Sequence, residues 1–192
     1  MVLLIDQFSK IYVKTHFYYG EEVKVFDWFR IFFVENNGMA WGTELGGHLG
    51  KLILTIFRIF AIVGLGWWLH ASIKKKASNS FLIAVSLILG GALGNVIDSV
   101  FYGLIFNEST PEQVATIFHE NTYGSLFYGK VVDMFYFPIW QGNLADWIPY
   151  MGESYFTFFN TIFNVADTAI TIGAVMLILL SKNSKKEVEK GD

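Results

Sequence analysis

Cysteine is absent from the 192-residue chain. This absence excludes disulfide bonds, thiol nucleophiles and thiolate metal sites. Charge is also scarce, because 16% of the residues are charged, against about 25% in a typical soluble domain. The net charge of −3 argues against a nucleic-acid-binding surface, and the four scattered histidines form no pair at zinc-ligand spacing. We therefore expect no nucleic-acid partner, no metal and no cofactor.

Apolar side chains, in contrast, are abundant. The chain is 53% hydrophobic and 18% aromatic, and its mean hydropathy is +0.42. A helix needs about 20 mostly apolar residues to cross a bilayer, and three segments qualify: 52–73, 81–101 and 156–180. Residues 1–17 resemble the end of another helix whose beginning is missing. The expected fold class is therefore an α-helical polytopic membrane protein, a four-span bundle with its first span truncated.

Lysines suggest the orientation, because short loops rich in Lys and Arg stay in the cytoplasm. Lys74–Lys76 follow the first full span, and four further lysines follow the last one. Residues 102–155 carry one basic residue, Lys130, and residues 15–50 carry five acidic residues against Lys24 and Arg30. We predict that these two segments lie outside, in which case Asp98 and Asp167 share the outer membrane face.

The outer segments carry their own patterns. Residues 22–34 are rich in β-branched and aromatic residues, which predicts a strand or hairpin at the interface. Residues 136–156 mix Trp and Tyr with Gly and Pro, which indicates a loop at headgroup level. Residues 110–120 begin with a helix N-cap pattern, Thr-Pro-Glu, and predict a short surface helix. The alternative for that segment is an ordered insertion without a function.

Two Asn-x-x-Asp pairs stand in the apolar spans, Asn95 with Asp98 and Asn164 with Asp167. Residues three apart share a helix face, so each pair projects an amide and a carboxyl together. Asp133 follows a strand-like run, and Asp6 has Lys10 at ion-pair spacing. The Asn36-Asn37-Gly38 sequence predicts a tight turn after a strand.

Several carboxyls at one level suggest acid–base chemistry. Two close carboxyls do not ionise together easily, so one activates water while the other, protonated, donates to the attacked carbonyl. The structural alternative is that these polar groups only hydrogen-bond helices together. For Arg58, we favour a structural role, snorkelling or pairing with Asp98. A functional role, neutralising an acid or binding a substrate carbonyl, is the alternative.

Five blocks in order resemble the lipoprotein signal peptidases, also called signal peptidase II. They are DQFSK (6–10), VENNGMAWG (34–42), GGALGNVID (90–98), VVDMF (131–135) and FNVADTAI (163–170). The resemblance implies one inner-membrane aspartyl protease domain over residues 1–192, with four spans, an extracytoplasmic β-cradle and a periplasmic helix. It also implies cleavage of diacylglyceryl-modified bacterial prolipoproteins just before the modified cysteine, at the periplasmic side. We expect a monomer among membrane lipids.

The resemblance assigns roles by motif. The catalytic pair would be Asp133 and Asp167, and Asn164 and Asn95 would orient that pair or the substrate. Supporting positions would be filled by Asp98, Asp6, Lys10, Gly94 and Ala166, and the substrate pocket would be lined by Asn36, Gly38 and Ala40.

The chain departs from the family pattern in three places. Ser99 stands where the family usually has Arg directly after the acid of the Gly-Asn-x-x-Asp block, and Arg58 is a candidate replacement for that Arg. Residues 104–129 lengthen the usual link between Asp98 and Asp133, and we expect this insertion segment to form a lid or a docking surface. The short first helix is the third departure.

Two other classes of function remain open at this stage. A small proton-coupled transporter would use paired Asp residues as proton carriers, but such sites lie at the bilayer midplane between repeats. A structural membrane scaffold would not need five ordered polar blocks.

Overall fold

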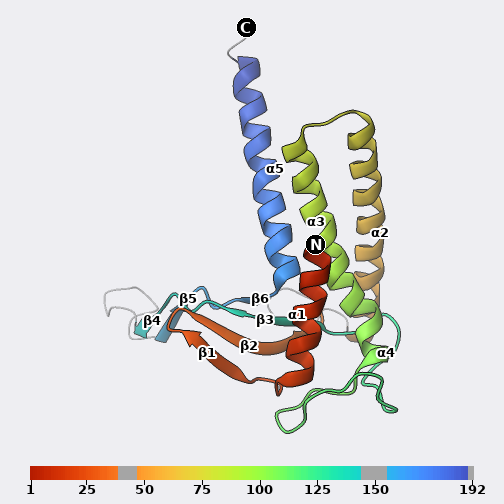
Figure 1. Ribbon diagram of the computed structural model, residues 1–192, viewed down its shortest axis with the longest axis vertical. Coiled ribbons are helices and arrows are strands. Elements are labelled where there is room, and N and C mark those ends of the chain that lie inside the picture. The colour runs from red at the N-terminus through yellow and green to blue at the C-terminus, as the bar shows by residue number, and fades with distance from the viewer. Residues whose placement is uncertain (39–46, 144–154, 190–192) are drawn as a thin grey trace.

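The computed structural model describes residues 1–38, 47–143 and 155–189. Three helices are long and apolar enough to cross a membrane: α2 (Gly47–Lys74), α3 (Asn79–Ile97) with its continuation, and α5 (Val165–Glu189). They run side by side, and α3 packs along α5 and against α2 (Figure 1). A shorter helix, α1 (Val2–His16), packs on α3 and α5. Three of the four predicted helical segments are thus confirmed as full-length candidate spans.

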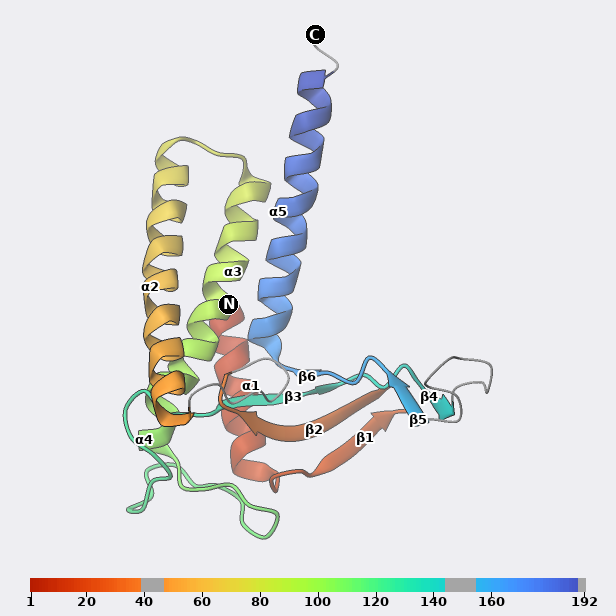
Figure 2. The same ribbon diagram turned by 180° about the vertical axis from the view of Figure 1, so that it is seen from behind.

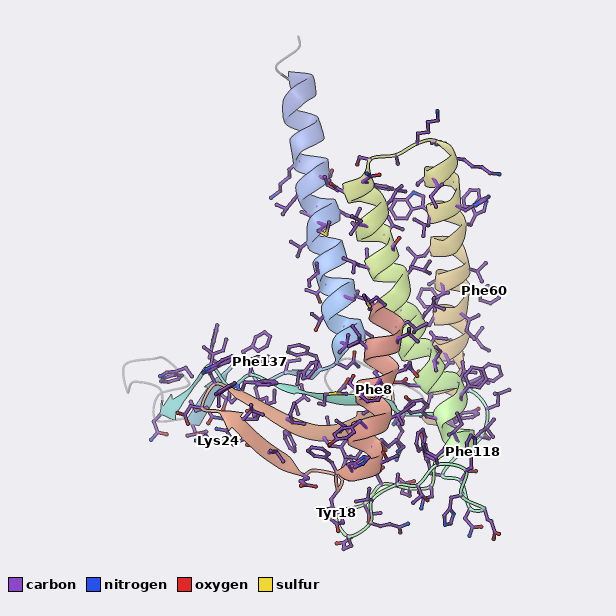
Figure 3. The ribbon with its side chains drawn as sticks, in the orientation of Figure 1. Phe8, Tyr18, Lys24, Phe60, Phe118 and Phe137 are labelled. Carbon is purple, nitrogen blue, oxygen red and sulfur yellow. The ribbon has the colours of Figure 1, made fainter. Side chains whose placement is uncertain are left out.

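Large apolar side chains cover the outside of this bundle. Phe60 points away from α2 (Figure 3) and is 71% exposed. Phe8 on α1 is similarly exposed. Because such surfaces are costly in water, they indicate helices that face lipid.

The Lys74–Lys76 loop and the C-terminal end of α5 lie at one end of the bundle, and the sheet lies at the other (Figures 1 and 2). This is the arrangement that the lysine distribution predicts. The sheet extends sideways from the bundle below α5.

The predicted hairpin is confirmed as β1 (Glu22–Phe26) and β2 (Phe29–Asn36). They belong to an antiparallel sheet of order β1-β2-β3-β6, with β3 at Val131–Tyr136 and β6 at Ile162–Phe163. We call this four-stranded sheet the cradle. One of its faces packs on a core that includes Val13, Phe33, Val132 and Met134.

The third span begins later than predicted. Residues 155–163 form β5 (Tyr155–Phe158) and β6 instead of helix, and β5 pairs with β4 (Trp140–Asn143). Aromatic and β-branched residues make this stretch apolar, but they also favour strands. Phe159 has a φ of +65°, and it turns the chain between β5 and β6. The predicted 136–156 loop is thus partly a hairpin, and residues 144–154 lie outside the described part.

The second span also differs from its prediction at one end. After Ile97, α3 continues through a π-helical turn, η2 (Asp98–Tyr102), into the short α4 (Gly103–Ile105). A π-turn widens the helix and leaves carbonyls free for other donors. The insertion segment supplies these donors. Gly129 N–H donates to Ser99 O over 2.9 Å, and Phe127 N–H donates to Val100 O over 3.0 Å.

The predicted helix at residues 110–120 is wrong, since this fully described stretch contains no helix. The Thr110 hydroxyl does accept from Glu112 N–H over 3.2 Å, as an N-cap would. Thr110 and Gln113 then exchange main-chain hydrogen bonds and close a tight turn. The Asn107 side chain accepts from Thr116 N–H at 2.7 Å, so local side-chain bonds compete with helix formation.

Candidate active site

Asp133 lies on β3 and is 4% exposed. Side chains alternate along a strand, so Val131 and Asp133 point away from the buried core that holds Val132. One oxygen of Asp133 accepts a hydrogen bond of 2.7 Å from Asn164 Nδ2, and the other accepts from Asn36 Nδ2. The carboxyl is therefore fixed from two sides by amide donors.

Asn164 is the N-cap of α5. Its Oδ1 accepts from Asp167 N–H over 2.9 Å, and Asp167 Oδ2 accepts in return from Asn164 N–H over 3.3 Å. Reciprocal bonds of this kind satisfy main-chain donors that a helix start leaves free. The Asn164 Nδ2 group remains available for Asp133, so one amide links the two predicted catalytic residues.

Asn95 on α3 orients Asp167 from another side. Asn95 Nδ2 donates to Asp167 Oδ1 over 2.8 Å, while Asn95 Oδ1 accepts from Lys10 Nζ over 2.8 Å. An ammonium only donates. Lys10 therefore fixes which end of the Asn95 amide faces Asp167.

Behind Asn95 lies a buried ionic cluster. Lys10 Nζ is 2.9 Å from Asp6 and 2.8 Å from Asp98, and all three side chains are fully buried. The predicted Asp6–Lys10 pair is thus confirmed. Asp6 Oδ1 also accepts from Ala166 N–H over 2.8 Å, which attaches α1 to the first turn of α5.

Sequence reasoning missed Gln7, which completes this cluster. Its Nε2 donates to Asp98 Oδ1 over 2.9 Å, and its Oε1 accepts from Tyr102 Oη over 3.2 Å. The only available signal was its position between Asp6 and Lys10 in the DQFSK block.

Gly94 and Ala166 are packing positions of this cluster. A Cβ at Gly94 would lie 3.1 Å from Asp6 Cγ and 3.2 Å from Ala166 Cβ. Both residues are buried. Small side chains here let α1, α3 and α5 approach closely, and neither residue lines the adjacent cavity as the structure describes it.

The polar groups face a cavity of about 640 Å³. Its polar lining includes Asn36, Arg58, Asn95, Asp133 and Asp167, and its apolar lining includes Phe159, Ile162, Phe163 and Ile172. Gly38 lines it as well, with a φ of +80° and an N–H that donates to Asn36 Oδ1 over 2.5 Å. The predicted turn is confirmed, whereas Ala40 lies outside the described residues.

Arg58 belongs to this cavity and does not pair with Asp98, whose oxygens are taken by Lys10 and Gln7. Its Nη2 donates to Gly38 O. The guanidinium occupies the place where a side chain at residue 38 would begin. The structural interpretation of Arg58 as a partner of Asp98 is therefore wrong. Ser99 in turn donates to Asn95 O over 2.9 Å and is buried.

Burial and, next, the negative charge of Asp167 raise the pKa of Asp133 to about 8, against the opposing effects of Lys10 and the amide donors. Asp133 therefore holds a proton at neutral pH. Asp167 is only partly buried. The two carboxyls thus have different environments on one cavity, which is the arrangement that separates an acid from a base. Among the described residues, no group of three or more His, Asp or Glu side chains is placed to hold a metal ion.

Together, the apolar helices and the cavity at their cradle end define a multi-pass membrane protein with a candidate hydrolytic site. Comparisons with known proteins identify the family. The family model described as Signal peptidase (SPase) II matches residues 1–182. The chain belongs to the signal peptidase II family.

Individual relatives agree with this assignment. The lipoprotein signal peptidase of Porphyromonas gingivalis is 44% identical over 182 residues, which are 93% of this chain and 78% of that protein. The lipoprotein signal peptidase of Amoebophilus asiaticus is 37% identical over 186 residues, 93% of this chain and 73% of that one. A solved structure described as a bacterial membrane enzyme superposes with a TM-score of 0.62 at 26% identity, covering 97% of this chain and 85% of that chain.

Proposed function

We propose that this protein is an aspartic endopeptidase that removes the signal peptide from diacylglyceryl-modified bacterial prolipoproteins, cutting just before the modified cysteine. The observation that carries the proposal is the pair of carboxyls, Asp133 and Asp167, that line one cavity and are linked through Asn164. Membership of the signal peptidase II family supports the substrate class.

In this proposal Asp167 is the base and Asp133 the acid. Asp167 takes a proton from a water molecule, whose oxygen attacks the carbonyl carbon of the scissile peptide bond. Asp133 gives its proton to the carbonyl oxygen, so no bare oxyanion forms. The C–N bond then breaks as Asp167 returns its proton to the leaving nitrogen, and Asp133 recovers a proton from the intermediate's hydroxyl group.

The surroundings of the two carboxyls suit this division. The pKa of about 8 keeps Asp133 protonated, and the Asn95 and Asn164 donors hold the Asp167 oxygens in place. The cavity also borders Thr168, Thr171 and Ile172 of α5. A peptide that leaves the bilayer beside α5 would therefore enter the cavity that both carboxyls line.

Arg58 is the proposed anchor for a substrate carbonyl. A guanidinium has five N–H donors, and the Gly38 carbonyl takes one of them. An arginine at the centre of a membrane helix costs about 2.5–3.5 kcal/mol on insertion scales, and ionisable residues in such helices commonly mark substrate paths. We expect Arg58→Ala to raise KM about tenfold and Arg58→Lys to recover part of the loss. Unchanged cleavage by both variants would exclude the role.

The test of the whole proposal is a gel-shift assay on a purified prolipoprotein that carries diacylglycerol. Asp133→Asn and Asp167→Asn should each lower cleavage by at least about a thousandfold, with the exposed Asp27→Asn as the matched control. Precursor without the lipid should not be cut. If either cavity variant cleaves like the parent protein, the two carboxyls are not the catalytic pair.

The pH dependence separates the two roles. Above pH 8, Asp133 loses its proton, so kcat/KM should fall about tenfold per pH unit. An enzyme whose activity continues to rise from pH 8 to pH 10 would contradict the assignment of Asp133 as the acid.

We also propose that the protein is a monomer of the bacterial inner membrane, with the cradle and the site on the periplasmic side. Because the chain has no cysteine, single cysteines report sidedness without background. A cysteine at the exposed Ser125 should react with an impermeant maleimide added to whole spheroplasts. A cysteine at Lys75 should react only after lysis, and the reverse pattern would invert the orientation.

A further inference from the structure

The proposed mechanism uses one face of the cradle, while the opposite face carries a second buried ionic cluster. In the β2–β3 register, Val34 pairs with Asp133 and Glu35 pairs with Val132. Side chains alternate across a sheet. Asn36 and Asp133 therefore face the cavity, whereas Glu35 lies on the rear face with the buried Phe33 and Val132.

The rear cluster consists of Glu35, Lys14, Ser109 and Lys130. Glu35 Oε1 forms an ion pair with Lys14 Nζ and accepts from Ser109 Oγ over 3.3 Å. Its Oε2 lies 3.9 Å from Lys130 Nζ. The Glu35 side chain is 2% exposed and that of Lys14 is fully buried.

The insertion segment supplies most of the surroundings of this cluster. Lys14 Nζ donates to Ser109 Oγ over 2.9 Å and lies over the rings of Phe106 and Tyr123 at 5.2 and 4.9 Å. Lys130, which follows the segment directly, pairs with Glu108 at 2.5 Å. Phe106 and Ala115 enter the core behind the cradle. The segment is thus fixed behind β2 and β3, so it does not form the predicted lid over the cavity.

β2 ends at Asn36, the residue directly after Glu35. Ends of strands open most readily, because they have few neighbours to hold them. Here the side chain of residue 35 is held from behind, and the side chain of residue 36 donates to Asp133 in front. A displacement at Glu35 would therefore move the Asn36 amide away from the carboxyl.

We propose that Glu35 is a positioning residue for the reaction, and that the insertion segment is a buttress that holds Glu35 through Ser109 and the adjoining Lys130. The proposal rests on the proposed function, since Asn36 acts on the reaction through Asp133. It assigns a role to a segment that lengthens the chain without contributing to the cavity lining.

The test measures the pH profile of kcat/KM on diacylglyceryl-modified prolipoprotein. The Asn36 donor favours the ionised form of Asp133, so its misplacement moves the basic limb to higher pH. The charged groups that act on Asp133 from other elements are Asp167 on α5, Lys10 on α1 and Arg58 on α2. None of these belongs to the rear cluster.

The first variant replaces both buried charges, Lys14→Met with Glu35→Gln, because removing Glu35 alone would leave Lys14 as a buried, unpaired charge. We expect kcat/KM to fall about tenfold and the basic limb to rise by about 0.5 pH unit. Ser109→Ala, which retains the ion pair, is the second variant and should move the limb in the same direction by less. Glu22→Gln, on the partly exposed Arg30–Glu22 pair of the cradle, is the control and should not move it.

Combining the charge-pair variant with Asn36→Ala tests whether the rear cluster acts on Asp133 through Asn36. Asn36→Ala alone should move the limb as the charge-pair variant does, and the combined variant should move it no further. A basic limb that stays in place in folded Lys14→Met/Glu35→Gln and Ser109→Ala proteins, or shifts that add fully, would overturn the buttress. In that case a loss of cleavage in Asp133→Asn would still support the proposed function, whereas cleavage by that variant would refute both.

Discussion

Lys10 and Lys14 lie one turn apart on α1, and both are completely buried. Lys10 contacts the groups beside the cavity, whereas Lys14 contacts the rear face of the cradle. Lys10 meets two carboxylates and the Asn95 amide that orients Asp167. Lys14 meets one carboxylate, a hydroxyl group and two aromatic rings on the rear of the cradle. One short helix thus holds the helical half of the site from one turn and the strand half from the next.

The difference between the two lysines lies in what remains when each is removed. Without Lys10, Asp6 and Asp98 would be two buried carboxylates with amide and main-chain donors only. Without Lys14, Glu35 would retain Ser109 and a second cation, Lys130. Burying an unpaired charge costs far more than weakening a shared one. The cluster that contacts the Asn95 amide is therefore also the less redundant one.

Lys10→Met should have the largest effect. Breaking a buried ion pair costs about 3–5 kcal/mol, and the Asn95 amide would lose the partner that fixes its orientation. We expect a sharp fall in the unfolding temperature in detergent and loss of prolipoprotein cleavage.

Lys10→Arg is the matched variant, because it retains the charge but changes the geometry at three acceptors. The Lys10→Arg protein should fold, but it should cleave prolipoprotein more slowly than the parent protein. Parent-like stability of Lys10→Met would show that Asp6 and Asp98 tolerate burial without a cation, and would remove the basis of the comparison.

Lys14→Met should have a smaller effect on the free energy of unfolding, about 1.5–3 kcal/mol, the usual value for a hydrogen bond to a charged group. Glu35 would turn to Lys130, which already lies 3.9 Å away. Thermal unfolding of both Met variants in the same detergent gives the ranking. A larger loss for Lys14→Met than for Lys10→Met would reverse it.

The same comparison shows what the sequence could reveal. Asp6 and Lys10 are four residues apart on one helix, so their spacing predicts the pair. Lys14 and Glu35 are 21 positions apart on a helix and a strand, and no local pattern joins them. The family motifs indicated Asn36, Asn95, Asn164, Asp133 and Asp167. The structure places four of them on one cavity, and the buried Asn164 donates to Asp133 from behind it.

The errors have a common physical cause. Residues 155–163 are apolar enough for a span, but cross-strand pairing with β3 and β4 overrides their hydropathy. Residues 110–120 have a good N-cap, but main-chain bonds between Thr110 and Gln113 close a turn, and the Asn107 side chain accepts from Thr116 N–H. In both places tertiary or side-chain partners decided the conformation, and a single sequence does not display such partners.

Glu22→Gln should have the smallest effect, and it sets the scale for the two lysines. The Arg30–Glu22 pair bridges β2 and β1 at 2.5 Å, but both side chains are partly exposed. Partly exposed ion pairs contribute roughly 0–1 kcal/mol, because water screens the charges and the free side chains lose entropy on pairing. We expect an unfolding temperature close to that of the parent protein, and unchanged cleavage.

The small remaining difference should disappear at high salt, where screening is complete. The Lys10 and Lys14 losses should persist there, because neither ion pair is in contact with solvent. A salt-sensitive loss in either lysine variant would mean that water enters its cluster. The ion pair there would then not be buried in solution, and it would not differ from Arg30–Glu22 in this respect.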